Sequence, residues 1–182
     1  MTDKNPELGR PEREYLLLLG RMQLSARLEG KVDLSGVVQQ TLWEAEKACP
    51  PDAQRLPWLR KLLANNLRDE IRKLTAKRRD VRREASIEAS IEESSSRLET
   101  WLAQKGSSAS QHLIRSEELG RLACALSELP ADQRMAIELH HLHGQPLAEV
   151  AEQLGRTKEA TAALLYRALK RLRKRLDAAG GE

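Results

Sequence analysis

The stretch from residue 147 to residue 175, LAEVAEQLGRTKEATAALLYRALKRLRKR, constrains the fold most, because it has the pattern of two helices joined by a tight turn. Apolar residues recur at i, i+3, i+4 and i+7 in its first part, so the first helix has one buried face. Gly155 can take the left-handed conformation that closes this helix. Thr157 is a suitable N-cap for the next one. The pattern predicts a helix-turn-helix whose second helix, from 157 to about 170, enters a major groove of DNA.

The second of these helices is predicted to have distinct inner and outer sides. The inner side is expected to comprise Ala162, Leu165, Ala168, Leu169 and Leu172, and the outer side Lys158, Thr161, Arg167 and Lys170. The helix N-terminus, Lys158 and the basic run that follows can together bind several phosphates. The alternative is a plain helical hairpin with a charged surface.

The charge of the chain is unevenly distributed. Eight basic and three acidic residues lie between Arg68 and Arg83, and six basic residues without an acidic one lie between Arg167 and Arg175. Five glutamates and a single arginine lie between Glu84 and Glu99. Two basic clusters separated by an acidic stretch suit a chain that contacts a polyanion at two places.

The rest of the chain also has helical periodicity. Phe is absent and aromatic residues make up 3% of the chain, which favours small helical cores over sheets. Helices are predicted over 12–28, 35–47 and 56–80, the last with an apolar stripe formed by Leu59, Leu62, Leu63, Leu67, Ile71 and Leu74. Residues 84–115 are rich in Ser and Glu, which predicts a linker outside the core. We therefore expect an all-α chain of two small helical domains, 10–83 and 116–177, joined by a flexible linker at 84–115.

Two motifs in these halves resemble those of sigma-70-type transcription initiation factors. The second half, LPADQRMAIELHHLHGQPLAEVAEQLGRTKEATAALLYRALKRLR, resembles the carboxyl-terminal domain of that family. In the first half, KVDLSGVVQQTLWEA is similar to the helix that docks on core RNA polymerase, and LPWLRKLLANNLRDEIRK to the helix facing the minus-ten promoter element. The order of the motifs, without a further domain between them, resembles the small extracytoplasmic-function class.

This resemblance implies a factor that binds core RNA polymerase and directs initiation at particular promoters. Its partners would be core polymerase and promoter DNA, and an anti-sigma protein is a further partner that the family allows. Contacts to the minus-thirty-five duplex are implied for Arg156, Thr157, Lys158, Thr161, Arg167 and Lys170. Contacts near the minus-ten element are implied for Trp58, Arg60, Lys61, Asn65, Arg68 and Arg72. Polymerase binding is implied for Val37, Val38, Gln39, Gln40, Thr41 and Leu42.

The chain departs from the family at several positions. Gly36 and Gln40 stand where relatives usually carry Asp and Glu, so restoring both acidic residues is expected to strengthen polymerase docking. Ala162 and Ala163 replace a frequent Val-Lys pair of the recognition helix. The alternative function is a stand-alone helix-turn-helix regulator that never joins polymerase.

Other classes of protein find little support in the sequence. His140, His141 and His143 do not converge on one helix face and have no second ligand cluster, so we expect no metal and no cofactor. No Gly-rich phosphate loop or nucleophile motif occurs, so no enzyme is predicted. The apolar run from Leu16 to Leu19 is too short to span a membrane, which predicts a cytoplasmic protein. Trp43 and Trp101 are expected to be packing residues and not platforms on which bases stack.

Overall fold

The computed structural model describes residues 8–24, 28, 30–48, 52–74, 81–104 and 112–179. Every regular element in this part of the chain is a helix and none is a strand, which confirms the predicted all-α class. The elements are α1 (Arg10–Gln23), α2 (Leu34–Ala48), α3 (Asp52–Leu74), α4 (Val81–Gln104), α5 (His112–Ser127), α6 (Ala131–Ile137), the π-helix η1 (Glu138–Leu142), α7 (Leu147–Gln153) and α8 (Lys158–Ala179).

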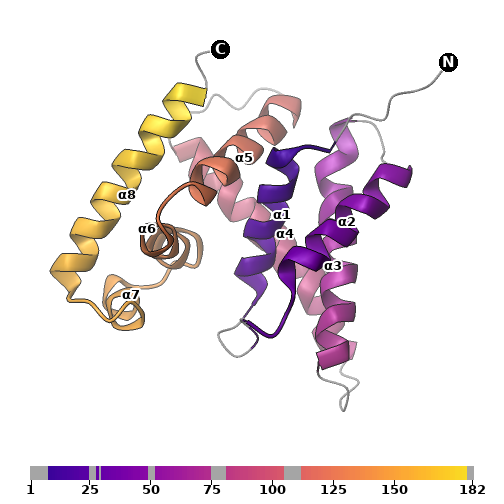
Figure 1. Ribbon diagram of the computed structural model, residues 1–182, viewed down its shortest axis with the longest axis horizontal. Coiled ribbons are helices and arrows are strands. Elements are labelled where there is room, and N and C mark those ends of the chain that lie inside the picture. Colours follow the sequence, from indigo (N-terminus) through magenta and orange to yellow (C-terminus); the bar gives the residue numbers. More distant parts are fainter. Residues whose placement is uncertain are drawn as a thin grey trace.

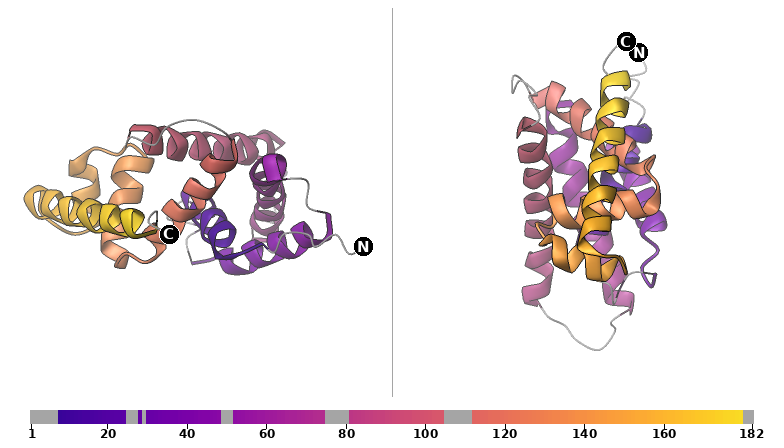
Figure 2. Two further views of the ribbon diagram at one scale, coloured as in Figure 1. Left: turned by 90° about the horizontal axis from the view of Figure 1, so that it is seen from above. Right: turned by 90° about the vertical axis from the view of Figure 1, so that its left-hand side faces the viewer.

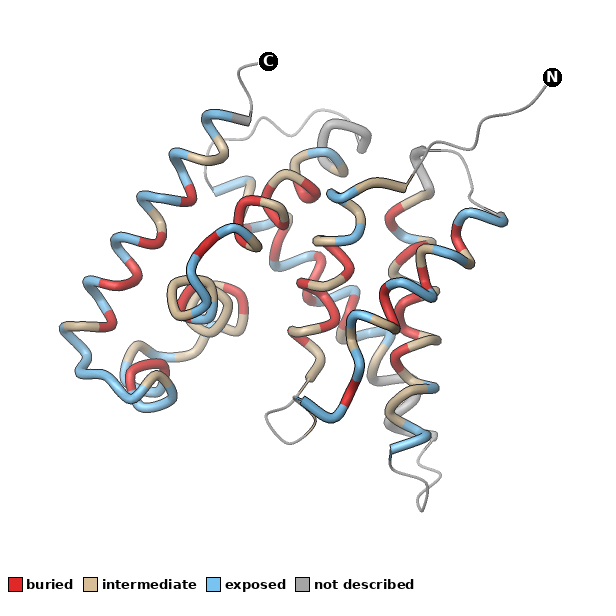
Figure 3. Tube along the Cα trace, viewed as in Figure 1, coloured by how far each residue is buried: buried red, intermediate tan, exposed pale blue. Residues whose placement is uncertain are grey.

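The helices are arranged with α8 at one end of the molecule and α2 and α3 at the other (Figure 1). α1, α4 and α5 lie between these ends. The view from above shows that α4 runs along one side of the molecule (Figure 2). Buried residues line the inner sides of the helices and exposed residues their outer sides (Figure 3). None of the described helices combines the length and the apolar character that a membrane span requires.

The core of the amino-terminal half contains leucines at helical spacing on α1 and α3. Leu16 and Leu19 of α1 and Leu59, Leu63 and Leu67 of α3 are fully buried. The predicted stripe of α3 is therefore confirmed at its centre. Its last member, Leu74, is exposed instead, because it lies in the final turn beyond the neighbouring helices.

The predicted linker differs from the structure over residues 84–104. This segment belongs to α4, a helix of 24 residues that packs against α1 and α3. Its buried positions recur at helical spacing: Ile91, Ser94, Ser95, Leu98 and Trp101. Two of them are serines, so the composition suggested a loop although the helical period is present. The prediction that this stretch lies outside the core is wrong, while KGSSAS at 105–110 lies outside the described residues.

A buried polar contact joins α4 to α1. The hydroxyl groups of Tyr15 and Ser95 lie 2.9 Å apart in a hydrogen bond, and both side chains are inaccessible to solvent. Burial raises the pKa of Tyr15, so its hydroxyl keeps its proton and can donate. The small serine side chains let α4 approach α1 closely enough for this contact.

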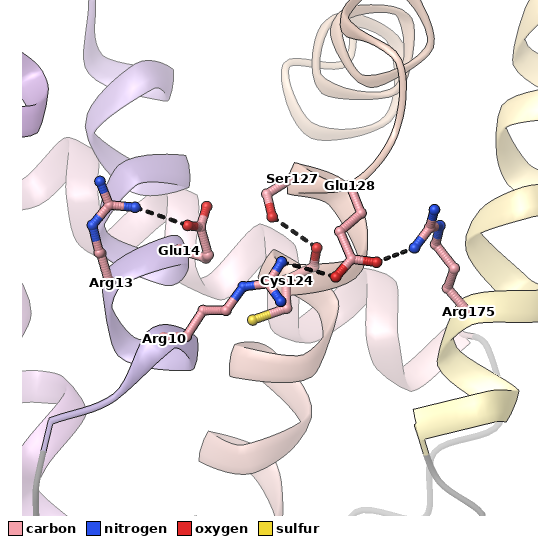
Figure 4. A network of polar contacts seen from close by, with 7 residues as sticks. All are labelled: Arg10, Arg13, Glu14, Cys124, Ser127, Glu128 and Arg175. Carbon is pink, nitrogen blue, oxygen red and sulfur yellow. Dashed lines mark hydrogen bonds and ion pairs between the residues drawn. The ribbon is translucent and has the colours of Figure 1, made fainter.

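The two halves of the chain contact each other through α1 and α5. A Cβ atom at Gly120 of α5 would lie 2.7 Å from Cβ of Pro11, so only glycine allows this approach. Glu128, after α5, lies between two arginines: it accepts a hydrogen bond from Arg10 of α1 at 2.8 Å and another from Arg175 of α8 (Figure 4). These exposed pairs contribute little stability individually. The division into two domains stays a prediction.

Candidate nucleic-acid interface

The turn between α7 and α8 has the geometry of a glycine-closed helix end. Gly155 has a φ of +61°, as its place in the sequence predicts. The N–H of Gly155 donates to the carbonyl of Glu152 at 3.1 Å, and that of Arg156 donates to the carbonyl of Ala151 at 2.9 Å. This pair of bonds satisfies the last carbonyls of α7 and directs the chain into α8.

The start of α8 is capped by Thr157, as predicted. Its hydroxyl oxygen accepts a hydrogen bond from the backbone N–H of Ala160 at 3.2 Å. Hydrogen bonds from the backbone N–H of Glu159 itself and from Thr157 lower the pKa of the Glu159 carboxyl group, which is fully exposed. The first turn of α8 is thus a fixed structure with an ionised carboxylate on its surface.

The burial pattern of α8 corrects two predicted positions. Thr161 has no exposed surface, and its hydroxyl donates to the carbonyl of Thr157 at 2.9 Å. It was predicted on the outer face and as a DNA contact. Ala162, predicted to face inward, is exposed. The inner stripe comprises Thr161, Leu164, Leu165, Ala168 and Leu172. It shares three of the five predicted residues and has Thr161 and Leu164 in place of Ala162 and Leu169.

Basic residues on α8 are available for a polyanion. Lys158, Arg167 and Lys170 are exposed, and in the part of the chain that the structure describes they form no ion pair. Arg156, in contrast, donates to Oδ2 of Asp132 on α6 at 3.0 Å. A phosphate contact by Arg156 therefore requires exchange of this partner. The three other cations need no such exchange.

The outer face of α8 contains residues that the sequence reasoning missed. Tyr166 is 69% exposed, the largest exposure reported for a large apolar or aromatic side chain among the described residues. Glu159, Ala162 and Ala163 lie exposed on the same helix. A turn of about 100° per residue places Tyr166 opposite the buried Ala168, so helical geometry alone could have found it.

The basic face of α3 is only partly accessible. Lys61 and Arg72 are exposed, as predicted, and Arg72 lies 3.5 Å from Asp69. Arg60 differs: its side chain is 11% exposed, and its Nε donates to Glu92 of α4 at 2.7 Å. Arg68 is half-buried and donates to Asn65 at 2.9 Å. Of the predicted minus-ten set, Lys61 and Arg72 are thus the most accessible cations.

Trp58 and Trp101 have different surroundings. Trp58 is partly buried and packs against the hydrophobic core. Trp101 is buried, as predicted, and stacks on His141 with ring centroids 5.6 Å apart.

The α2 motif divides into core and surface. Val37, Val38 and Thr41 are buried, so they support the helix from within and form no partner surface. Thr41 donates to the carbonyl of Val37 at 2.8 Å and accepts from Asn66 of α3 at 3.1 Å. Leu42 is partly buried, and Gln39 and Gln40 are exposed.

Trp43 was predicted to be a packing residue, but more than half of its side chain is exposed. It is 53% exposed, and the ammonium group of Lys47 lies 3.0 Å from the centre of its ring. Together with Gln39 and Gln40 it forms an accessible surface on α2.

The three histidines near η1 lie within the helical domain. Nδ1 of His140 is 2.8 Å from the carbonyl of Gln145. Burial lowers the pKa of His143. Among the described residues, no group of His, Cys, Asp and Glu side chains could hold a metal ion.

Comparison of the chain with known proteins gives one match, to a protein-family model. Neither the curated proteins nor the solved structures include a significant match. Residues 119–172, less than half of the chain, match the protein-family model described as sigma-70, region 4. The matched residues run from α5 into α8 and include the whole turn at Gly155. The carboxyl-terminal half is therefore similar to sigma-70 region 4 over the residues that form the helix-turn-helix.

Proposed function

We propose that the chain is a promoter-specificity subunit of the extracytoplasmic-function class, which joins core RNA polymerase and directs initiation at particular promoters. The match of residues 119–172 to sigma-70 region 4 carries this proposal. In the same residues, a glycine-closed turn leads into a capped helix with exposed cations. Transcription would place the protein in the cytoplasm.

The second half would bind the minus-thirty-five duplex through α8. Lys158, Arg167 and Lys170 are exposed cations along more than three helical turns, so they can contact phosphates on both sides of a groove. At the start of α8 the amide groups of Glu159 and Ala160 already donate to the Glu159 carboxylate and to Thr157, so the cations provide the phosphate contacts. Helix-turn-helix proteins place the first turns of this helix against base edges.

The first half would dock on polymerase through α2. Trp43 supports this assignment, because exposed tryptophans are frequent anchors of protein interfaces. The exposed amides of Gln39 and Gln40 lie on the same helix and can complete the surface. Lys61 and Arg72 on α3 would contact the minus-ten strand, because exposed cations suit the binding of a single strand.

A stand-alone helix-turn-helix regulator is the second candidate. The family match lies entirely within the carboxyl-terminal half, so it leaves the polymerase-binding role of α2 without independent support. The burial of Val37, Val38 and Thr41 also explains their pattern by packing alone.

Transcription with purified components distinguishes the two candidates. Bacterial core RNA polymerase, the full-length chain and a library of promoter fragments should give run-off transcripts that are absent without the chain. Trp43→Ala should reduce co-purification with core polymerase. Leu74→Ala, which removes an exposed apolar side chain from α3, should leave it unchanged. Binding to DNA without any association with core polymerase would favour the regulator.

A further inference from the structure

The centre of the outer face of α8 is uncharged. Tyr166 is 69% exposed and precedes the buried Ala168 by two residues, which places it about 160° around the helix from the core. Ala162 and Ala163 are exposed one turn earlier. We call these three residues the uncharged patch.

Charged residues border the uncharged patch at both ends. Lys158 lies one turn before Ala162, Arg167 one turn after Ala163 and Lys170 one turn after Tyr166, and all three are exposed. Cations at the two ends can bind phosphates and hold the helix in a groove. The patch between them then faces the base edges.

The chemistry of the patch selects among the four bases. Guanine and adenine are recognised in the major groove by hydrogen-bonding Arg, Lys, Asn or Gln side chains, and the patch has none. The thymine 5-methyl group is recognised by apolar contact, which alanine methyl groups and an aromatic ring provide. Ala163 and Tyr166 lie about 4.5 Å apart along the helix axis, which is on the order of one base-pair step of about 3.4 Å, so they can reach neighbouring base pairs.

Glu159 disfavours guanine beside the patch. Its pKa is lowered by the hydrogen bonds at the helix start, so the carboxylate is ionised and can only accept. The major-groove edge of guanine also presents only acceptors. A guanine next to Glu159 would therefore face a negative charge without a donor.

We propose that α8 recognises duplexes that present thymine 5-methyl groups at two neighbouring base pairs, through Ala162, Ala163 and Tyr166. This inference rests on one part of the proposed function, the binding of duplex DNA by α8. It adds the kind of base sequence that α8 recognises, and it identifies Tyr166 as a residue that determines specificity.

The test starts from randomised duplexes selected by the full-length chain, alone and in complex with bacterial core RNA polymerase. Each thymidine of an enriched duplex is then replaced singly by deoxyuridine, which removes only the methyl group. Affinity should fall about fourfold at each of one or two neighbouring positions, the value expected for one buried methyl. Tyr166→Ala should abolish the loss at one position, and Tyr166→Phe should retain it. Lys174→Ala, an exposed change on the same helix, should keep full methyl sensitivity.

Three results would overturn the inference: enriched duplexes without neighbouring thymines, unchanged affinity after every deoxyuridine replacement, or full methyl sensitivity in Tyr166→Ala. Because Tyr166 is exposed, its variants should keep the helical circular dichroism of the parent chain, which checks folding. If neither form of the protein enriches any duplex, the duplex-binding step of the proposed function fails too. Enrichment without methyl sensitivity overturns this inference alone.

Discussion

Arg60 of α3 donates a hydrogen bond from Nε to Oε1 of Glu92 on α4 at 2.7 Å, and its side chain is 11% exposed. It also lies 3.4 Å from the hydroxyl of Tyr15. A residue that the sequence places on a DNA-binding face is therefore part of the packing between α3 and α4.

Arg60→Ala should accordingly lower stability. Loss of a partly buried charged hydrogen-bond partner typically costs about 1–3 kcal/mol, to be measured by urea unfolding. Lys61→Ala is the matched control, because Lys61 is the exposed neighbour, and its stability should stay within about 0.5 kcal/mol. If Lys61 contacts one phosphate of the minus-ten single strand, its loss should reduce the salt slope of single-strand binding by about 0.7. Equal stability of the two variants would contradict the assignment of Arg60 to the core.

Ser95→Ala tests whether α4 belongs to the core in solution. The substitution removes the partner at 2.9 Å from the buried Tyr15 hydroxyl, which should cost about 1–3 kcal/mol of unfolding free energy. Ser96→Ala changes the adjacent, exposed serine and should have little effect. Limited proteolysis should leave residues 87–104 intact in the parent chain. Early cleavage there would restore the prediction of a linker.

Thr157→Ala should destabilise the helix-turn-helix. The variant loses the hydrogen bond from the Ala160 N–H, and removal of an N-cap typically costs about 0.5–2 kcal/mol. Thr157→Ser keeps the hydroxyl and should retain most of this stability. Thermal unfolding followed by circular dichroism provides the comparison, and identical midpoints for the two variants would rule out a capping role.

The sequence predicted the helix-turn-helix well because its signals are local. Gly155 acts through its own backbone conformation and Thr157 through a side-chain hydrogen bond to a residue three positions later, so their residue types identify them. The buried face of α8 was harder to predict, because Thr161 is polar and yet buried. Its hydroxyl donates a hydrogen bond to the carbonyl of Thr157 and so has a partner within the protein. A buried polar residue of this kind is readily assigned to the surface, and a neighbouring apolar residue then takes its place in the predicted stripe.

Packing between distant segments could not be predicted in this way. Ser94 and Ser95 have the composition of a linker, and their burial depends on how closely α4 approaches α1. Such relations are properties of the tertiary structure, and no local pattern encodes them.

Gly36 and Gln40, the departures from the family pattern, both have local partners. Asp33 accepts a hydrogen bond from the backbone N–H of Gly36 at 2.9 Å, as an N-cap does. Gln40 donates to Glu44 at 2.6 Å. Gly36 and the amide of Gln40 therefore form favourable contacts within α2, whether or not a partner protein binds.

Gly36→Asp should lower stability relative to Gly36→Ala. A Cβ atom at this position would lie 2.5 Å from Oδ2 of Asp33, so both substitutions displace the capping carboxylate. Alanine compensates through its better helix propensity, by about 0.5–1 kcal/mol. Aspartate has a lower propensity and adds a second negative charge beside Asp33. The difference between the two variants should be about 1 kcal/mol in urea unfolding.

Gln40→Glu should add a smaller cost of about 0.2–0.5 kcal/mol, because it places like charges at i and i+4 with Glu44. This cost should diminish in high salt. Gln39→Glu, on the neighbouring exposed position, is the control and should be close to neutral. Any gain in polymerase affinity from restoring the acidic residues must therefore be measured in a competition assay beside the unfolding curves. Tighter binding by a less stable Gly36→Asp, Gln40→Glu double variant would show that the acidic residues serve the partner. Weaker binding together with lower stability would mean that α2 docks in its capped, uncharged form.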